Sequence, residues 1–257
     1  MNYKKNSPQK NMKPMIKIFE TADELVSALA DEFQKTINEQ AKLDRDFYIA
    51  LSGGNTPAIF FQKLASSHYR ENIAWQNVQL FWGDERCVAP EHPDSNYGMT
   101  KKNLLDHVAI PPKNIHRILG ENKPVTEAKR YAQEIEIIVP EDISGFSQFD
   151  WIFLGLGIEG HTASIFPDSD ILKNQKDICA VATHPESGQL RITLTLPVIN
   201  HAKRIAFLVI GENKASVVAK ILTGAEESKS MPAAFVGPVH GILEWYLDQA
   251  AATIIRG

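Results

Sequence analysis

Cysteine is scarce in this sequence. Its 257 residues include only two cysteines, Cys87 and Cys179, which lie far apart along the chain. Two separated thiols are too few for a disulfide framework or a zinc site. We therefore expect both to be ordinary thiols in a reducing compartment.

Long apolar runs and a secretory signal are also missing. No run approaches the roughly 20 apolar residues that span a bilayer, so no membrane partner is expected. Residues 1–14 contain lysines without an apolar segment behind them, which does not fit a signal peptide. We predict a disordered leader at residues 1–14 and a cytoplasmic protein. Because no repeat, low-complexity tract or linker follows, residues 15–257 are predicted to form one domain.

An excess of positive charge is absent as well. The net charge is −4, whereas proteins that bind nucleic acid are usually basic, so no nucleic-acid partner is expected. A small anionic substrate remains compatible with this charge, since a local cluster of Lys and Arg would suffice to bind it. The hydrophobic content of 44% and charged content of 23% are typical of a globular protein with a sizeable core.

Strand-like and helix-like segments alternate along the chain. Strands are predicted at residues 15–19, 47–51, 78–82, 115–119, at the start of 149–167, and at 178–183, 191–196, 204–210 and 233–236. Helices are predicted after a Thr21–Glu24 capping box, at 57–68, from near Asn96 onward, at 125–139, from Lys214 to Leu222, and at 242–251. This alternation predicts an α/β fold with an open, mainly parallel twisted sheet and helices on both faces.

The stretch 149–167 is the best candidate for a catalytic segment. A buried apolar run passes into a glycine-rich loop that ends in Glu159, Gly160 and His161. Such loops lie at the carboxyl edge of a parallel sheet, where open α/β folds bind ligands. A histidine supported by a carboxylate is the expected general base near neutral pH. Ser164 is not part of a nucleophile elbow, which favours a histidine-activated water, and no second histidine has metal-site spacing.

Two further turns follow predicted strands at the same sheet edge. The turn Ser52-Gly53-Gly54-Asn55-Thr56 precedes a helix and could bind phosphate through backbone amides, or could be a tight connection with Thr56 as helix cap. It is neither a P-loop nor a GxGxxG fingerprint. In the second turn, Asp84 could orient a water or a substrate hydroxyl, and Arg86 could stabilise an oxyanion. The alternative is a solvated turn with an internal ion pair.

Two late cations could contribute to the same site. Arg191 begins a predicted strand and Lys214 precedes a predicted helix, so both could bring positive charge to one end of the sheet. A cation at a helix N-terminus is disfavoured by the helix dipole unless an anion lies between them. The alternative for each is a surface salt bridge.

These segments, in this order, resemble the 6-phosphogluconolactonase family of the pentose phosphate pathway. The resemblance covers nearly the whole chain after the first fifteen residues and rests on residues 51–57 (LSGGNTP), 82–86 (WGDER), 95–98 (SNYG), 154–157 (LGLG), 160–167 (GHTASIFP), 191–197 (RITLTLP), 211–215 (GENKA) and 245–248 (WYLD). It implies a Rossmann-like sheet as in glucosamine-6-phosphate deaminase, no metal or cofactor, and hydrolysis of 6-phospho-D-glucono-1,5-lactone to 6-phosphogluconate.

The resemblance also assigns roles to individual residues. It makes His161 the base that activates water, with Arg86 and Asp84 at the sugar end of the site. It makes the following residues phosphate and substrate contacts: Ser52, Gly53, Gly54, Thr56, Arg191 and Lys214. The family usually has Asp where this chain has Glu159, and we expect activity to survive because the carboxylate is retained. The expected partner is a small sugar-phosphate lactone, and the expected assembly is a monomer or weak homodimer.

Two rival functions follow from the same residues. A glucosamine-6-phosphate deaminase is the rival enzyme; that family has a Glu five residues after the loop histidine, where this chain has Phe166, which cannot transfer protons. A non-catalytic sugar-phosphate-binding protein is the rival outside catalysis, and it is suggested only by Glu159.

Overall fold

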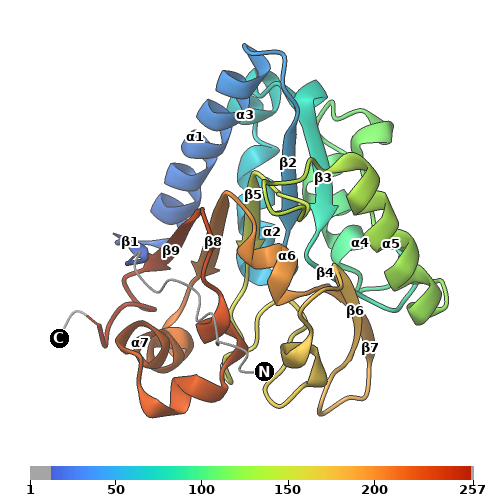
Figure 1. Ribbon diagram of the computed structural model, residues 1–257. Coiled ribbons are helices and arrows are strands. Elements are labelled where there is room, and N and C mark those ends of the chain that lie inside the picture. The colour runs from blue at the N-terminus through green and yellow to red at the C-terminus, as the bar shows by residue number, and fades with distance from the viewer. Residues whose placement is uncertain (1–12, 256–257) are drawn as a thin grey trace.

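A computed structural model describes residues 13–255 of the chain (Figure 1). Six strands form one sheet in the order β1-β9-β8-β5-β2-β3, and every neighbouring pair is parallel. These strands are β1 (Met15–Phe19), β2 (Phe47–Leu51), β3 (Val78–Trp82), β5 (Trp151–Leu154), β8 (Arg204–Val209) and β9 (Ile242–Asp248). The predicted parallel α/β sheet is therefore confirmed. All but the last two residues of the predicted leader, 1–14, lie outside the described residues.

A smaller antiparallel sheet follows the large one. It has the order β4-β7-β6 and consists of β4 (Asp84–Arg86), β6 (Cys179–Thr183) and β7 (Leu190–Leu194). Gly83 joins the two sheets: its N–H donates to the Leu51 carbonyl at 2.7 Å, and its carbonyl accepts from the Leu194 N–H at 2.7 Å. The chain thus passes from β3 into β4 without a loop, which was not predicted.

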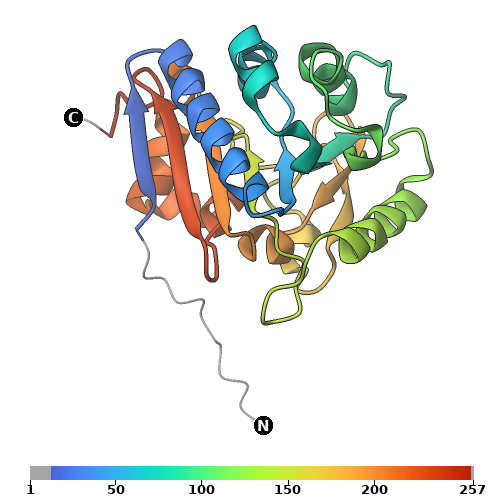
Figure 2. The same ribbon diagram turned by 90° about the horizontal axis from the view of Figure 1, so that it is seen from above.

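Helices cover the large sheet on both sides. They are α1 (Ala22–Ala41), α2 (Asn55–Leu64), α3 (Ser67–Asn72), α4 (Asn96–Thr100), α5 (Pro124–Ile138), α6 (Leu196–Asn200) and α7 (Ala215–Thr223). Figure 2 shows α1 and α2 on one side and α5 and α6 on the other. The Thr21 cap is confirmed, because its hydroxyl accepts from the Glu24 N–H at 3.2 Å. No helix within residues 13–255 has the length and apolarity that a membrane span requires.

Four predicted elements differ from the structure. Residues 242–248 of the predicted helix 242–251 form β9 instead, because a run of apolar side chains buried between β1 and β8 fits a strand even when its spacing also fits a helix. Residues 233–235 of the predicted strand 233–236 belong to a 3₁₀ turn at Pro232–Phe235, which Val236 ends. Residues 115–119 form only one bridge, between Leu80 and Ile115, and the predicted helix 57–68 is divided into α2 and α3.

Candidate active site

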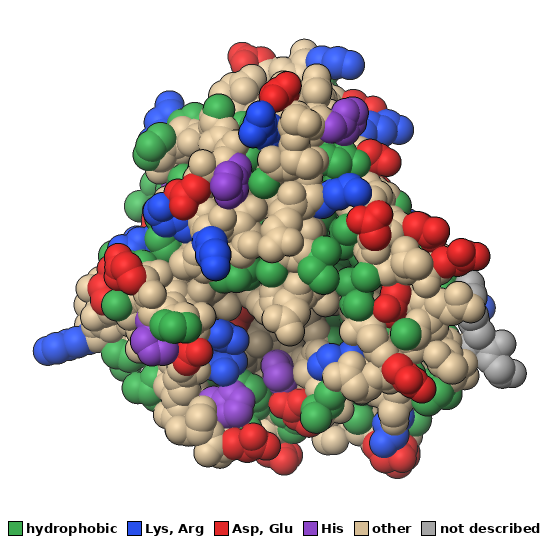
Figure 3. Space-filling view, turned by 180° about the vertical axis from the view of Figure 1, so that it is seen from behind, with side chains coloured by type: hydrophobic (Ala, Val, Ile, Leu, Met, Phe, Trp, Pro, Cys, Tyr) green, Lys and Arg blue, Asp and Glu red, His purple; other side chains and the backbone are tan. Residues whose placement is uncertain are grey.

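A cleft of about 430 Å³ lies where the carboxyl ends of β2, β3, β5 and β8 face the small sheet. Nine of the ten predicted site residues line it: Ser52, Gly53, Gly54, Thr56, Asp84, Arg86, His161, Arg191 and Lys214. The tenth, Glu159, contacts His161 from outside the cleft wall. Figure 3 shows a hollow in the lower half of one face with Lys, Arg and His side chains at its rim, in keeping with this lining.

His161 and Glu159 form a coupled pair on the loop after β5. Nδ1 of His161 lies 2.6 Å from Oε1 of Glu159. Burial alone would raise the pKa of Glu159, but hydrogen bonds from its own N–H and from His161, with the charge of Lys214, bring that pKa below its usual value. Because an ionised carboxylate can only accept, Nδ1 of His161 carries the proton and Nε2 is left free to accept one.

Glycines shape this loop closely around the histidine. A Cβ at residue 157 would lie 2.1 Å from Nδ1 of His161, so the imidazole rests on bare backbone. Gly160 has φ +87°, and a Cβ there would come within 2.5 Å of Met231. The Gly160 carbonyl also accepts from the Ala233 N–H at 2.9 Å, which ties the loop to the segment after α7.

Asp84 is buried but is held by neutral groups. Its Oδ2 accepts from the Ser164 hydroxyl at 2.7 Å, and its Oδ1 accepts from Nδ2 of Asn96 at 3.3 Å. Asp84 is only 5% exposed, so these bonds satisfy a carboxylate that water scarcely reaches. Asn96 also lines the cleft, and sequence analysis assigned it no role beyond starting a helix.

Arg86 and Arg191 face each other across the small sheet. They are directly paired in the antiparallel register of β4 and β7, where like charges are unfavourable. Burial first, and the charge of Arg86 second, lower the pKa of Arg191. The Nε atoms of both arginines are buried without a hydrogen-bond partner, and neither guanidinium forms an ion pair within the described residues. Two unneutralised cations pointing at one cleft are suited to an anionic ligand.

Glu85 holds the loop that carries Asn96, a function that sequence analysis missed. Its carboxylate accepts from the backbone N–H groups of Arg86, Asn96 and Tyr97 at 2.7–2.8 Å. It also accepts from the Ser95 hydroxyl at 3.0 Å. Burial raises the pKa of Glu85 although these hydrogen bonds oppose the rise. The buried carboxylate therefore fixes the start of α4 against β4.

The turn 52–56 leads directly into α2. Its helix cap is Gly54, with φ +101°, so the alternative in which Thr56 caps the helix is wrong. A Cβ on Gly53 would lie 1.8 Å from Oδ1 of Asn96, so this glycine allows the asparagine to reach the turn. The first amides of α2 border the cleft and are suited to an anion.

Lys214 lies on the opposite side of the cleft from the small sheet. It ends the 3₁₀ turn Glu212–Lys214 that precedes α7. Burial lowers the pKa of Lys214, and the charge of Glu159 opposes that effect. Among residues 13–255 it has no ion-pair partner, so the alternative of a surface salt bridge is wrong for Lys214, as it is for Arg191.

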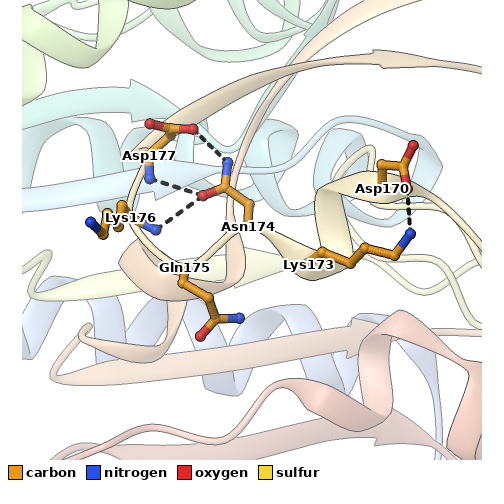
Figure 4. Close-up of a pocket in the computed structure, with 6 residues that line it drawn as sticks. All are labelled: Asp170, Lys173, Asn174, Gln175, Lys176 and Asp177. Atoms are coloured by element: carbon orange, nitrogen blue, oxygen red, sulfur yellow. Dashed lines mark hydrogen bonds and ion pairs between the residues drawn. The ribbon is translucent and has the colours of Figure 1, made fainter.

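Another hollow on the described surface is less suited to be a binding site than the cleft. It is larger, at about 580 Å³, but is open and is lined by one surface segment, residues 170–177 (Figure 4). Its polar groups bind one another, as in the 2.6 Å ion pair of Lys173 and Asp170, and no predicted site residue lines it. Within the described chain, no three His, Cys, Asp or Glu side chains are grouped to bind a metal ion.

Known proteins match this chain over nearly its whole length. The family model described as glucosamine-6-phosphate isomerases/6-phosphogluconolactonase matches residues 20–245. A 6-phosphogluconolactonase of Haemophilus influenzae is 45% identical over 92% of this chain and 98% of its own. A crystal structure of devB protein is also 45% identical, with a TM-score of 0.88 over 94% of this chain and 99% of that one. The structure of 6-phosphogluconolactonase from Trypanosoma brucei is 28% identical, with a TM-score of 0.84 over 95% and 100%.

Proposed function

The chain belongs to the glucosamine-6-phosphate isomerase/6-phosphogluconolactonase family, and we propose that it hydrolyses 6-phospho-D-glucono-1,5-lactone to 6-phospho-D-gluconate. One observation supports this most directly: the His161–Glu159 pair borders a cleft that also holds two arginines and a lysine without ion-pair partners among residues 13–255. A base next to concentrated positive charge suits an ester substrate that carries phosphate.

The proposed reaction begins at Nε2 of His161. This atom accepts a proton from water while Nδ1–H remains bonded to Glu159, which supports the imidazolium. The water oxygen forms a bond to the lactone carbonyl carbon, and Arg86 stabilises the negative charge that develops on the carbonyl oxygen. The bond from that carbon to the ring oxygen then breaks, and the ring oxygen takes the proton back from His161. The product is an open-chain carboxylic acid.

The remaining cleft residues are proposed to bind the substrate. Asp84 orients a sugar hydroxyl or the attacking water. Arg191, Lys214 and the amides of Ser52, Gly53, Gly54 and Thr56 bind the phosphate and the rest of the sugar, since cations and helix N-termini are the usual phosphate ligands. We also infer that residues 15–257 act as one cytoplasmic domain, as a monomer or weak homodimer, which sedimentation of the purified protein would test.

Steady-state hydrolysis of the phospholactone by purified protein tests the proposal. His161→Ala is expected to lower kcat by about 10²–10⁴-fold because a general base typically contributes that much. His68→Ala is the matched control, since His68 is exposed on α3 and distant from the cleft lining. Hydrolysis by His161→Ala at the parent rate would refute the mechanism.

The rival functions give different results in the same preparation. A deaminase would release ammonia from glucosamine 6-phosphate, which we do not expect because the side chain at 166 is phenylalanine. Phe166 is 3% exposed, and its ring centroid lies 5.0 Å from that of His161. A sugar-phosphate-binding protein would bind 6-phosphogluconate without turning over the lactone.

A further inference from the structure

Asp84 lies beside two arginines without forming an ion pair with either. Asp84 and Arg86 are two residues apart on β4 and so share one face of the small sheet, and Arg191 is opposite Arg86 on β7. The carboxylate and both guanidinium groups border the same cleft. The guanidinium fork matches the two oxygens of a carboxylate, so neighbouring Asp and Arg side chains can form a strong bidentate pair. The absence of such a pair between Asp84 and either arginine therefore needs a structural cause.

The Ser164 hydroxyl occupies the position between Asp84 and Arg191. It donates to Oδ2 of Asp84 at 2.7 Å and accepts from Nη1 of Arg191 at 3.5 Å. Ser164 itself is fully buried, so it has no direct access to a ligand in the cleft. Its backbone is fixed independently, because its N–H donates to the Thr193 hydroxyl at 3.1 Å.

Arg86 also forms a hydrogen bond to a neutral group in place of Asp84. Its Nη1 donates to the Asp94 carbonyl at 2.6 Å, while Asn96 donates to the second oxygen of Asp84. Each oxygen of the Asp84 carboxylate therefore accepts a hydrogen bond from an uncharged donor. Both arginines keep an unused buried Nε donor and their full positive charge.

We propose that Ser164 is a positioning residue that keeps Asp84 from pairing with Arg191, so that the Arg191 guanidinium stays available to the anionic substrate. This rests on the proposed function, because it takes the cleft to bind a phosphorylated ligand. Without the hydroxyl, Oδ2 of Asp84 would lack a donor, and the neighbouring guanidinium would turn to satisfy it. The enzyme would then bind its substrate less well but would retain its base, His161.

The test compares Ser164→Ala with the parent in two measurements. Calorimetry with inorganic phosphate should show a dissociation constant raised about tenfold, the effect expected when one charge-assisted contact is lost. Steady-state kinetics with the phospholactone should show KM raised by a similar factor while kcat changes less than about threefold. A variant that merely loosened the fold would not separate KM from kcat in this way.

Thr193→Val is the matched control. It removes the hydroxyl that anchors the Ser164 backbone but leaves the Ser164–Asp84 bond in place. It should lower the melting temperature about as much as Ser164→Ala and leave phosphate affinity unchanged. Ser164→Thr, which retains a hydroxyl, should bind phosphate as the parent does. Equal weakening by Thr193→Val, or unchanged phosphate affinity in folded Ser164→Ala, would overturn the proposal.

A second variant, Ser164→Cys, provides the test if Ser164→Ala does not fold. Ser164→Cys keeps nearly the same shape but is a weak donor, so its phosphate affinity should fall between those of the parent and a variant without a donor. Unchanged affinity would again overturn the proposal. Because phosphate binding is measured without turnover, a protein that binds phosphate in this pattern but does not hydrolyse the lactone would refute only the proposed reaction.

Discussion

The imidazole of His161 rests directly on the backbone of Gly157. The space that a Cβ would need at residue 157 is occupied by the ring, with Nδ1 at 2.1 Å and Cε1 at 2.4 Å, and by Oε2 of Glu159 at 2.8 Å. The glycine is therefore required for the position of the base and its carboxylate, as well as for the turn of the loop. This contact gives the first of five predictions.

Gly157→Ala is expected to displace His161 while leaving the fold intact. The imidazole is 25% exposed and can move outward, so the clash should cost catalysis more than stability. Because a displacement of about 1 Å in an active site can cost on the order of 10²-fold, kcat should fall by about that factor. Gly237→Ala is the control, since a Cβ there meets nothing within 4 Å. Parent-like kcat in Gly157→Ala would contradict the arrangement described here.

Substitutions of Glu159 should separate its charge from its length. Glu159→Gln keeps a hydrogen-bond acceptor for Nδ1 but removes the charge that supports the imidazolium, so kcat should fall by about 10- to 100-fold. Glu159→Asp keeps the charge and should remain within about tenfold of the parent. Steady-state kinetics of the parent and both variants tests this. A Glu159→Gln variant with a higher kcat than Glu159→Asp would show that the negative charge does not contribute to catalysis.

Lys214 should contribute to substrate affinity. Its partly buried ammonium has no ion-pair partner among the described residues, and burial lowers its pKa, so an anionic ligand would relieve an unfavourable charge. Lys214→Gln is expected to raise KM by about 10- to 100-fold. Lys220→Gln, on helix α7 directly after Lys214 but outside the cleft, is the control. If both variants kept the parent KM, Lys214 would have no part in binding.

The acid stability of the fold should depend on Glu32. Burial alone would raise the pKa of this carboxylate, but the Tyr246 hydroxyl, Lys17 and Arg204 lower it from 4.5 to about 2. A carboxylate with a lowered pKa stabilises the folded state above its ordinary pKa and loses that contribution as the pH falls towards its folded-state pKa. Glu32→Gln should therefore lower the melting temperature at pH 7 and flatten its decline between about pH 4.5 and 2.

The control for this effect is Glu39→Gln. Glu39 is an exposed residue of the same helix, α1, and should leave the pH dependence unchanged. Melting curves collected from pH 7 to 2 would reveal the difference. Identical profiles for the parent and Glu32→Gln would show that this ion-pair group contributes nothing to acid stability.

Most of the fold follows from local patterns, and its exceptions have physical causes. Strands such as Val78–Trp82 are short, mostly apolar runs bounded by turn residues, and their short length and β-branched or aromatic residues favour a strand over a helix. Residues 242–248 contain apolar side chains at spacings that suit either a helix or a strand, and only burial between two neighbouring strands decides between them. The turn at Pro232–Phe235 is similarly set by its contact with Gly160, which is distant in sequence.

The residues of the cleft were predictable in part. His161, Arg86 and Lys214 follow strands of one parallel sheet, and the carboxyl ends of such strands meet at one edge. The roles of Glu85 and Asn96 depend on a contact between β4 and α4 that no local pattern encodes. Ser164 was considered only as a nucleophile, because its hydrogen bond to Asp84 joins residues 80 positions apart.

Gly83 hydrogen-bonds to both sheets and, together with the Ser164 bonds to Asp84 and Thr193, joins the small sheet that carries Arg86 and Arg191 to the large sheet, from which the His161 loop extends. Lengthening these bonds would change the distance from the cations to the base without altering any side chain of the cleft itself. Because these few bonds set the distance between the cations and the base, warming should lower turnover before the far-ultraviolet circular dichroism, which reports mainly the helices, changes.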